Sequence, residues 1–80
     1  MPIYYFDLRD EDELFPDEEG LEFSSLPAVQ EEAAKSLADM ARNAVCSSQP
    51  LSKRYLAIEV RDEIGPVMQV RFKFEITGRN

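Results

Sequence analysis

Carboxylates are the residue type that could do chemistry in this 80-residue sequence. Eight of the 13 residues from position 7 to position 19 are Asp or Glu. Carboxylate oxygens suit a hard cation such as Ca²⁺ or Mg²⁺. The candidate metal ligands are Asp10, Asp12, Asp17 and Glu19.

The spacing of these acids departs from that of a calcium-binding loop. Counting from Asp10, the fifth position holds Leu14, and the position that should be glycine holds Phe15. Asp17 and Glu19 could instead form the carboxylate pair of a hydrolase. The simplest interpretation is a solvated acidic loop that aids solubility and repels polyanions.

The sequence lacks most of the residues that other catalytic or redox chemistry requires. The sequence has no histidine, so the usual general base and the Ser-His and Cys-His systems are absent. Its glycines are isolated from one another, which excludes a glycine-rich phosphate loop. The single cysteine, Cys46, rules out an internal disulfide and is predicted to be an inert residue at a helix end. We therefore predict no catalytic residues, no cofactor and no enzymatic activity.

The charge is distributed unevenly along the chain. Residues 1–50 contain 12 acids and three bases, whereas residues 51–80 contain four acids and six bases, which together give the net charge of −7. A net-acidic domain repels phosphate backbones, so nucleic acid is an unfavourable partner. No apolar run reaches the roughly 18 residues of a membrane span, and the acidic start is unlike a signal peptide. We expect a soluble cytoplasmic protein of bacterial type.

One long segment has helical periodicity. Its apolar positions recur at steps of three and four residues, which places them on one helix face: Leu26, Val29, Ala33, Leu37, Met40 and Ala44. Ser25 is the predicted N-cap, and Pro27 falls in the first turn, where a missing N–H costs little. The helix should end at Val45 or Cys46, before the Ser-Ser-Gln-Pro sequence at 47–50.

Alternating apolar and polar residues predict four strands, at residues 2–9, 21–23, 55–62 and 67–76. Residues 10–20 are predicted to be a loop or irregular hairpin connection. We expect Leu14 and Phe15, which interrupt its charges, to pack back onto the core. Residues 62–66 are predicted to form a hairpin turn, and residues 77–80 a short polar tail.

These elements predict an α+β fold with the order β-β-α-β-β. The first strand has large side chains on both faces, so we place it inside the sheet. An antiparallel four-stranded sheet of order 2-1-3-4 then gives every strand an antiparallel neighbour, and the helix packs on one face. Residues 1–80 form a single domain.

The last predicted strand offers an interaction surface. It is long and lies at the sheet edge, where unpaired backbone groups invite pairing with another chain. A single helix also covers only one sheet face, so association would bury more of this small domain. The interface candidates are Tyr55, Val67, Gln69, Arg71 and Lys73. The same basic and aromatic side chains could alternatively contact RNA weakly.

Three segments resemble a known family. They are Tyr-Phe-Asp-Leu-Arg-Asp at 5–10, Pro-Asp-Glu-Glu-Gly-Leu-Glu at 16–22 and Ile-Glu-Val-Arg-Asp-Glu at 58–63. Together they resemble a family of short bacterial proteins known only as a domain of unknown function. The family pattern has a glycine after the first Arg-Asp pair, where Glu11 stands here, so we expect a different first turn. The strand and helix order is also similar to small antitoxin-like folds of HicB type.

The sequence thus favours a non-enzymatic protein-interaction module that associates with itself or with another protein. A carboxylate site for a metal or small ligand in residues 10–19 and weak RNA binding by the last hairpin are the alternatives.

Overall fold

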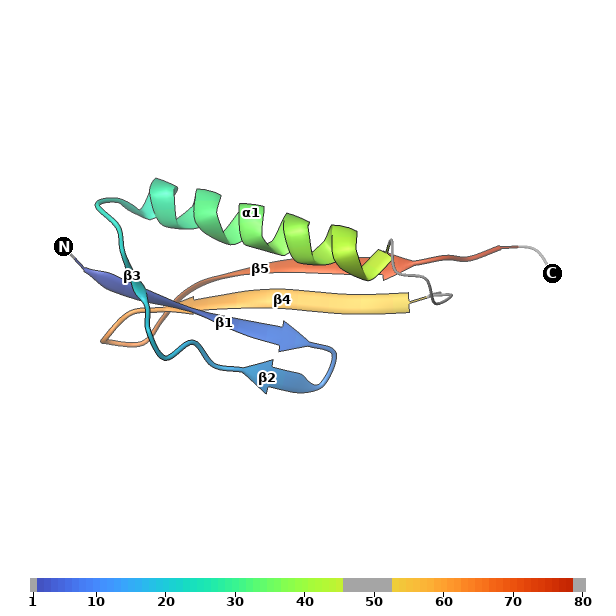
Figure 1. Ribbon diagram of the computed structural model, residues 1–80, viewed down its shortest axis with the longest axis horizontal. Helices are drawn as coiled ribbons and strands as arrows, with labels where there is room; N and C mark the ends of the chain where they lie inside the picture. Colours follow the sequence, from blue (N-terminus) through green and yellow to red (C-terminus); the bar gives the residue numbers. More distant parts are fainter. Residues whose placement is uncertain (1, 46–52, 79–80) are drawn as a thin grey trace.

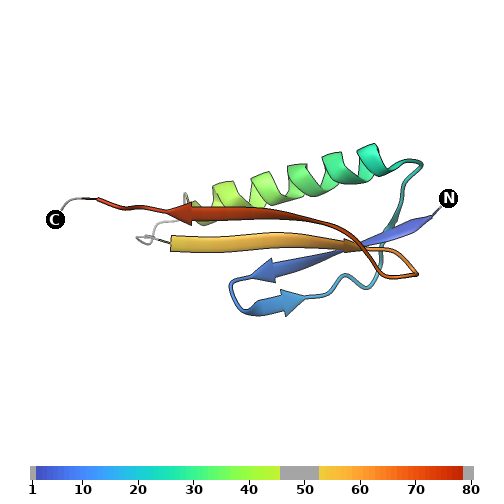
Figure 2. The same cartoon turned by 180° about the vertical axis from the view of Figure 1, so that it is seen from behind.

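The computed structural model describes residues 2–45 and 53–78. Figures 1 and 2 show one helix lying along one face of an antiparallel sheet. In chain order the elements are β1 (Ile3–Asp10), β2 (Glu13–Phe15), β3 (Leu21–Glu22), α1 (Leu26–Val45), β4 (Lys53–Arg61) and β5 (Pro66–Glu75). The predicted α+β fold is confirmed.

β1 lies inside the sheet, as its aromatic residues on both faces predicted. It pairs with β4 on one side, and β5 pairs with β4 in turn. On its other side β1 pairs with β2 near its end and with β3 near its start. The strand order therefore differs slightly from the expected 2-1-3-4: β3, the predicted second strand, pairs with β1, but the unexpected strand β2 shares that edge of β1 with it.

β2 makes one expectation wrong. Leu14 and Phe15 were expected to pack onto the core, but they are 45% and 49% exposed. Both belong to β2, where successive side chains point to opposite faces of the sheet. β2 also lies at the sheet edge away from β5, whereas α1 packs on β4 and β5. Neither side chain can therefore reach the helix.

The turn between β1 and β2 has a conformation that glycine usually provides. Glu11 has a φ of 56°, in the left-handed region. Its backbone N–H donates to the Tyr55 carbonyl at 3.0 Å, and its carboxylate accepts the Tyr55 N–H at 2.9 Å. Glutamate is thus held in a glycine-like conformation by a side-chain bond that glycine could not make.

α1 begins as its sequence predicts. The Ser25 hydroxyl accepts the Ala28 N–H at 3.3 Å, which makes Ser25 the N-cap. Of the predicted stripe, Val29, Ala33 and Leu37 are buried, whereas Leu26 at the helix start is 50% exposed. Ala41 is buried as well, so the covered stripe follows four-residue steps for most of its length.

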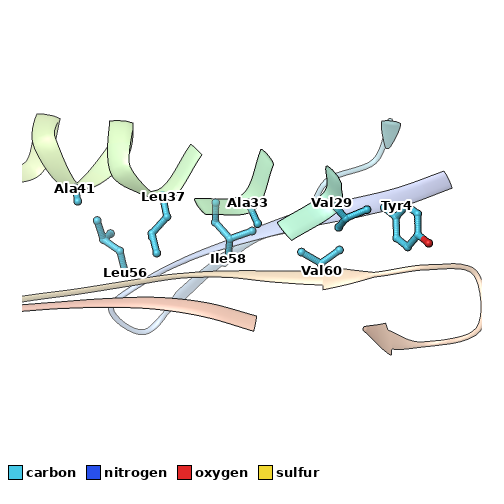
Figure 3. Close-up of a cluster of buried hydrophobic side chains, with 8 residues drawn as sticks. All are labelled: Tyr4, Val29, Ala33, Leu37, Ala41, Leu56, Ile58 and Val60. Carbon is cyan, nitrogen blue, oxygen red and sulfur yellow. The ribbon is translucent and has the colours of Figure 1, made fainter. Parts of the chain in front are cut away.

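The core lies between α1 and the helix-facing side of β4. Figure 3 shows helix side chains pointing toward Leu56, Ile58 and Val60, which alternate along β4, and Tyr4 closing one end. Phe6, Val70 and Phe72 pack partly buried against this cluster, so the helix stripe is used by the core as predicted. Ile58 is 3% exposed and Val60 1%.

The β4–β5 hairpin turns through residues 62–65. The Asp62 carboxylate accepts backbone N–H groups of Ile64 at 2.8 Å and Gly65 at 2.9 Å. Hydrogen bonds from Gly65 and then Ile64 lower the pKa of Asp62 from its ordinary value. The predicted inert role of Cys46 and the helix-ending turn at 47–50 lie outside the described residues.

Ile58→Val should lower the free energy of unfolding by about 0.5–1.5 kcal/mol, and Ile58→Ala by about 2–5 kcal/mol, because each leaves a cavity in the core. Urea denaturation at one protein concentration measures both. Ile64 is the matched control, since it is 96% exposed. Ile64→Ala should change stability by no more than about 0.5 kcal/mol. Equal effects at both positions would contradict the core placement.

Candidate functional site

The acidic loop closes a gap in the sheet. Along the outer edge of β1, Tyr4 pairs with β3 and Leu8 pairs with β2, so Phe6 between them has no strand partner on that edge. The Asp17 carboxylate fills this place by accepting the Phe6 N–H at 3.1 Å. Its other oxygen accepts the N–H groups of Glu19 at 3.1 Å and Gly20 at 3.4 Å. Asp17 therefore holds the loop to the strand as a third strand segment would.

A second carboxylate fastens the same loop from the face opposite the helix. Asp7 is buried at 8% exposure and accepts the Asp17 N–H at 2.9 Å. Its other oxygen accepts Nε of Arg61 at 2.9 Å. Arg61 also donates to the Asp17 carbonyl at 3.0 Å, and its guanidinium carbon lies 4.5 Å from the centre of the Tyr5 ring. The buried acid is thus both paired and hydrogen-bonded, which a buried charge requires.

Two opposing effects set the ionisation of Asp17. Partial burial raises the pKa of its carboxyl, but hydrogen bonds from Phe6, Glu19 and Gly20 and the charge of Arg61 outweigh burial. The pKa of Asp17 is therefore below its ordinary value. Its ionised form stabilises the fold.

The metal candidates do not gather around one point. Asp10 accepts Nη2 of Arg54 at 2.8 Å, on the other side of β1 from the Arg61 pair. Asp17 uses its oxygens on backbone groups, whereas Asp12 and Glu19 are exposed. Within residues 2–45 and 53–78, no three His, Cys, Asp or Glu side chains could together hold a metal ion. The arrangement of the loop is that of a structural clasp.

Four of the interface candidates, Tyr55, Gln69, Arg71 and Lys73, lie on the sheet face away from the helix, whereas Val67 packs against the core. Tyr55 is the direct cross-strand partner of Lys73. The N–H and C=O groups of Tyr55 both bond to Glu11, on the β1 side of β4. Because backbone groups alternate in direction along a strand, the N–H and C=O groups of Leu56 and of every second residue after it point toward β5. Leu56 pairs with Phe72, so the N–H and C=O groups of Phe72 point back toward β4. From Gln69 onward, the intervening β5 residues direct their N–H and C=O groups outward: Gln69, Arg71, Lys73 and Glu75. Val67 is the extra residue of a β-bulge opposite Val60 and Arg61, so it falls outside this alternation.

This outward set forms a free edge. In the part of the chain that the structure describes, no strand pairs with β5 on the side away from β4. Gln69, Arg71, Lys73 and Glu75 are exposed. We call these outward backbone groups and their side chains the β5 edge. Sequence reasoning named three of its four residues and missed Glu75, whereas its further candidate Val67 is half-buried and packs against the core.

On the helix-free face of the sheet, most charged side chains are paired, whereas the basic side chains of the β5 edge are not. Glu59 accepts Nε of Arg9 at 3.0 Å and the Gln69 side-chain amide at 3.1 Å. A shallow depression of about 370 Å³ beside it is lined in part by Glu59, Asp7 and Arg61, whose charges are paired with one another or with neighbours. Arg71 and Lys73 have no hydrogen bond or ion pair among the described residues. Two cations thus remain available on the edge.

Residues 3–73 match the family described as a domain of unknown function (DUF6894). Since this is most of the chain, the protein belongs to that family, as the resemblance indicated. No curated protein and no solved structure shows significant similarity to it. Within the described residues, α1 is not apolar enough to cross a membrane.

Asp17→Asn should remove part of the acid sensitivity of the fold. Because the folded pKa of Asp17 is lowered, its stabilising effect is present above the ordinary pKa of about 4 and is lost as pH falls below it. Thermal melts between pH 7 and pH 3 should show a smaller loss of stability for Asp17→Asn than for the original chain. Asp12→Asn, which removes the same charge at an exposed position, should leave the pH profile unchanged. Parallel profiles for all three proteins would contradict this assignment.

Gly20→Ala should destabilise the clasp. Gly20 has a φ of 73°, and an added Cβ would lie 2.6 Å from Cγ2 of Ile3 and 2.9 Å from Cε1 of Tyr5. We expect a loss of about 1–3 kcal/mol from backbone strain and crowding, measured by urea denaturation. A Cβ at Gly65 would meet nothing within 4 Å, so Gly65→Ala is the matched control. A similar loss for both variants would show that the close packing at Gly20 is unimportant.

Proposed function

We propose that this domain is a non-enzymatic protein-interaction module that binds through the β5 edge. The observation that supports it is the length of the free edge: β5 has ten residues, and four of them, from Gln69 to Glu75, direct backbone groups outward. Edge strands of this kind bind other chains by adding a strand to the sheet. Backbone hydrogen bonds supply affinity in this mode, and alternating side chains supply specificity.

A second copy of the chain is the proposed partner. On the helix side of β5, Met68, Val70 and Phe72 are only partly buried, although they pack on the core. Pairing two copies edge to edge would continue the sheet and cover these side chains further. A domain of 80 residues gains stability when it buries more apolar surface in this way.

The acidic half of the molecule supports this assignment by exclusion. The carboxylates of Asp7, Asp17 and Asp10 already bond to backbone amides or arginines. Among the described residues, the β5 edge therefore keeps more free hydrogen-bonding groups than this acidic cluster. The proposed role therefore needs no metal and no catalytic group. It requires only a partner strand.

The Arg71→Pro variant tests the edge directly. The Arg71 N–H points away from β4, so proline removes an outward donor without breaking the β4–β5 ladder. Analytical ultracentrifugation at high micromolar concentration should give the original chain twice its 9.2 kDa mass and give Arg71→Pro a single chain mass.

Two controls make this result specific. Arg71→Ala removes the same side chain but keeps the N–H, so it should remain a dimer. Phe72→Pro removes a donor that faces β4 and should instead destabilise the fold, as circular dichroism would show. An original chain that sediments at 9.2 kDa would overturn the proposed self-association.

A further inference from the structure

We infer that two copies pair β5 with β5 in antiparallel fashion, with the two-fold axis passing through Val70. This inference rests on the proposed self-association and adds its register. It follows from the alternation of backbone groups along β5 and from the positions of two cations on the β5 edge.

A two-fold axis allows only a few registers. In a symmetric antiparallel pair, one residue lies opposite its own copy, and the neighbours on each side pair in reverse order. Each choice of the axial residue therefore fixes what faces Arg71 and Lys73. Like charges directly opposite each other destabilise a sheet, so these two residues discriminate between registers.

Three central registers bring like charges together. With the axis at Arg71, this arginine faces its own copy. With the axis at Phe72, Arg71 faces the partner's Lys73, and the same contact occurs twice. With the axis at Lys73, this lysine faces its own copy. The Arg71 axis overlaps as much of β5 as an axis at Val70 would, and the Phe72 and Lys73 axes overlap less of it.

An axis at Val70 avoids these contacts and keeps most of the strand. Arg71 then faces the partner's Gln69, and Lys73 faces the partner's Val67. An axis at Phe74 would pair Lys73 with the partner's Glu75, but it would use only the end of β5. An axis at Gln69 also avoids like charges, but it shortens the overlap.

The helix side of the sheet also fits the Val70 axis. Val70 would pack on its own copy, and Phe72 would pack on the partner's Met68. All three side chains are partly buried against the core of a single copy. Phe72 is further held by a stacked contact with Phe74, with ring centres 6.4 Å apart. The dimer would thus join two rows of apolar side chains.

The backbone completes this pairing. With Val70 on the axis, the outward groups of Gln69 and Arg71 pair with those of the partner's Arg71 and Gln69, which gives about four hydrogen bonds. The two basic residues then have a clear role. They allow the pairing centred on Val70 and penalise the neighbouring registers into which the two strands could slip.

Cysteine scanning tests the register in a Cys46→Ser background, which removes the only native cysteine. A disulfide needs Cα atoms within about 7 Å, so only a residue close to the axis can link to its own copy. Under mild oxidation Val70→Cys should form linked dimers at least tenfold faster than Arg71→Cys or Phe72→Cys. Non-reducing electrophoresis measures the rates, and circular dichroism checks that each variant is folded.

A second measurement uses exposed positions, in case Val70→Cys disturbs the core. Gln69 and Arg71 of opposite copies are direct partners in this register. A mixture of Gln69→Cys and Arg71→Cys should therefore link rapidly as a heterodimer, whereas each variant alone should link slowly. Fastest linking by Arg71→Cys or Phe72→Cys alone would overturn the Val70 register while leaving the β5-edge dimer in place. Slow linking in every case, with a 9.2 kDa species in solution, would overturn the dimer itself.

Discussion

The fold depends on a carboxylate that substitutes for a strand. Between β3 and β2 the outer edge of β1 has no strand opposite Phe6, and Asp17 supplies the missing acceptor at 3.1 Å. Asp7 and Arg61 hold Asp17 from behind, with bonds of 2.9 Å and 3.0 Å to its backbone. One edge of the sheet is therefore closed by a loop rather than by a complete strand. An edge closed in this way presents few free backbone groups to another chain.

This arrangement makes the two edges of the sheet unequal. The β2 side is short, acidic and interrupted, and its backbone is partly used by the clasp of Asp7, Asp17 and Arg61. The β5 side is long and is regular from Met68 onward, and it has two exposed cations. The uneven charge of the sequence thus corresponds to a physical difference between the edges, with the protected edge in the acidic half and the available edge in the basic third.

Periodicity was enough to predict the helix, the central strand and the order of the sheet apart from β2. Those predictions depend on which faces are apolar, and residues such as Val29, Ile58 and Val60 follow that pattern closely. The clasp escaped prediction because it joins three segments through single hydrogen bonds. Acids in a charged loop look alike in sequence, and only the sheet geometry distinguishes Asp17, which faces an open amide, from Asp12, which faces water. β2 was missed for a related reason: three residues are too few to show a period, and their pairing comes from the glycine-like turn at Glu11.

The same geometry gives a structural role to the segments that resemble the family. Asp7, Asp17, Gly20 and Arg61 lie in the three quoted stretches, and every one of them takes part in closing the sheet edge. A cluster of charged residues shared among distant segments usually suggests a site of chemistry. Here both acids are saturated by backbone amides and an arginine, so their charges are used for folding. The side chains left available for recognition, Arg71 and Lys73, lie on β5, where regular strand sequence offers the least distinctive pattern in the chain.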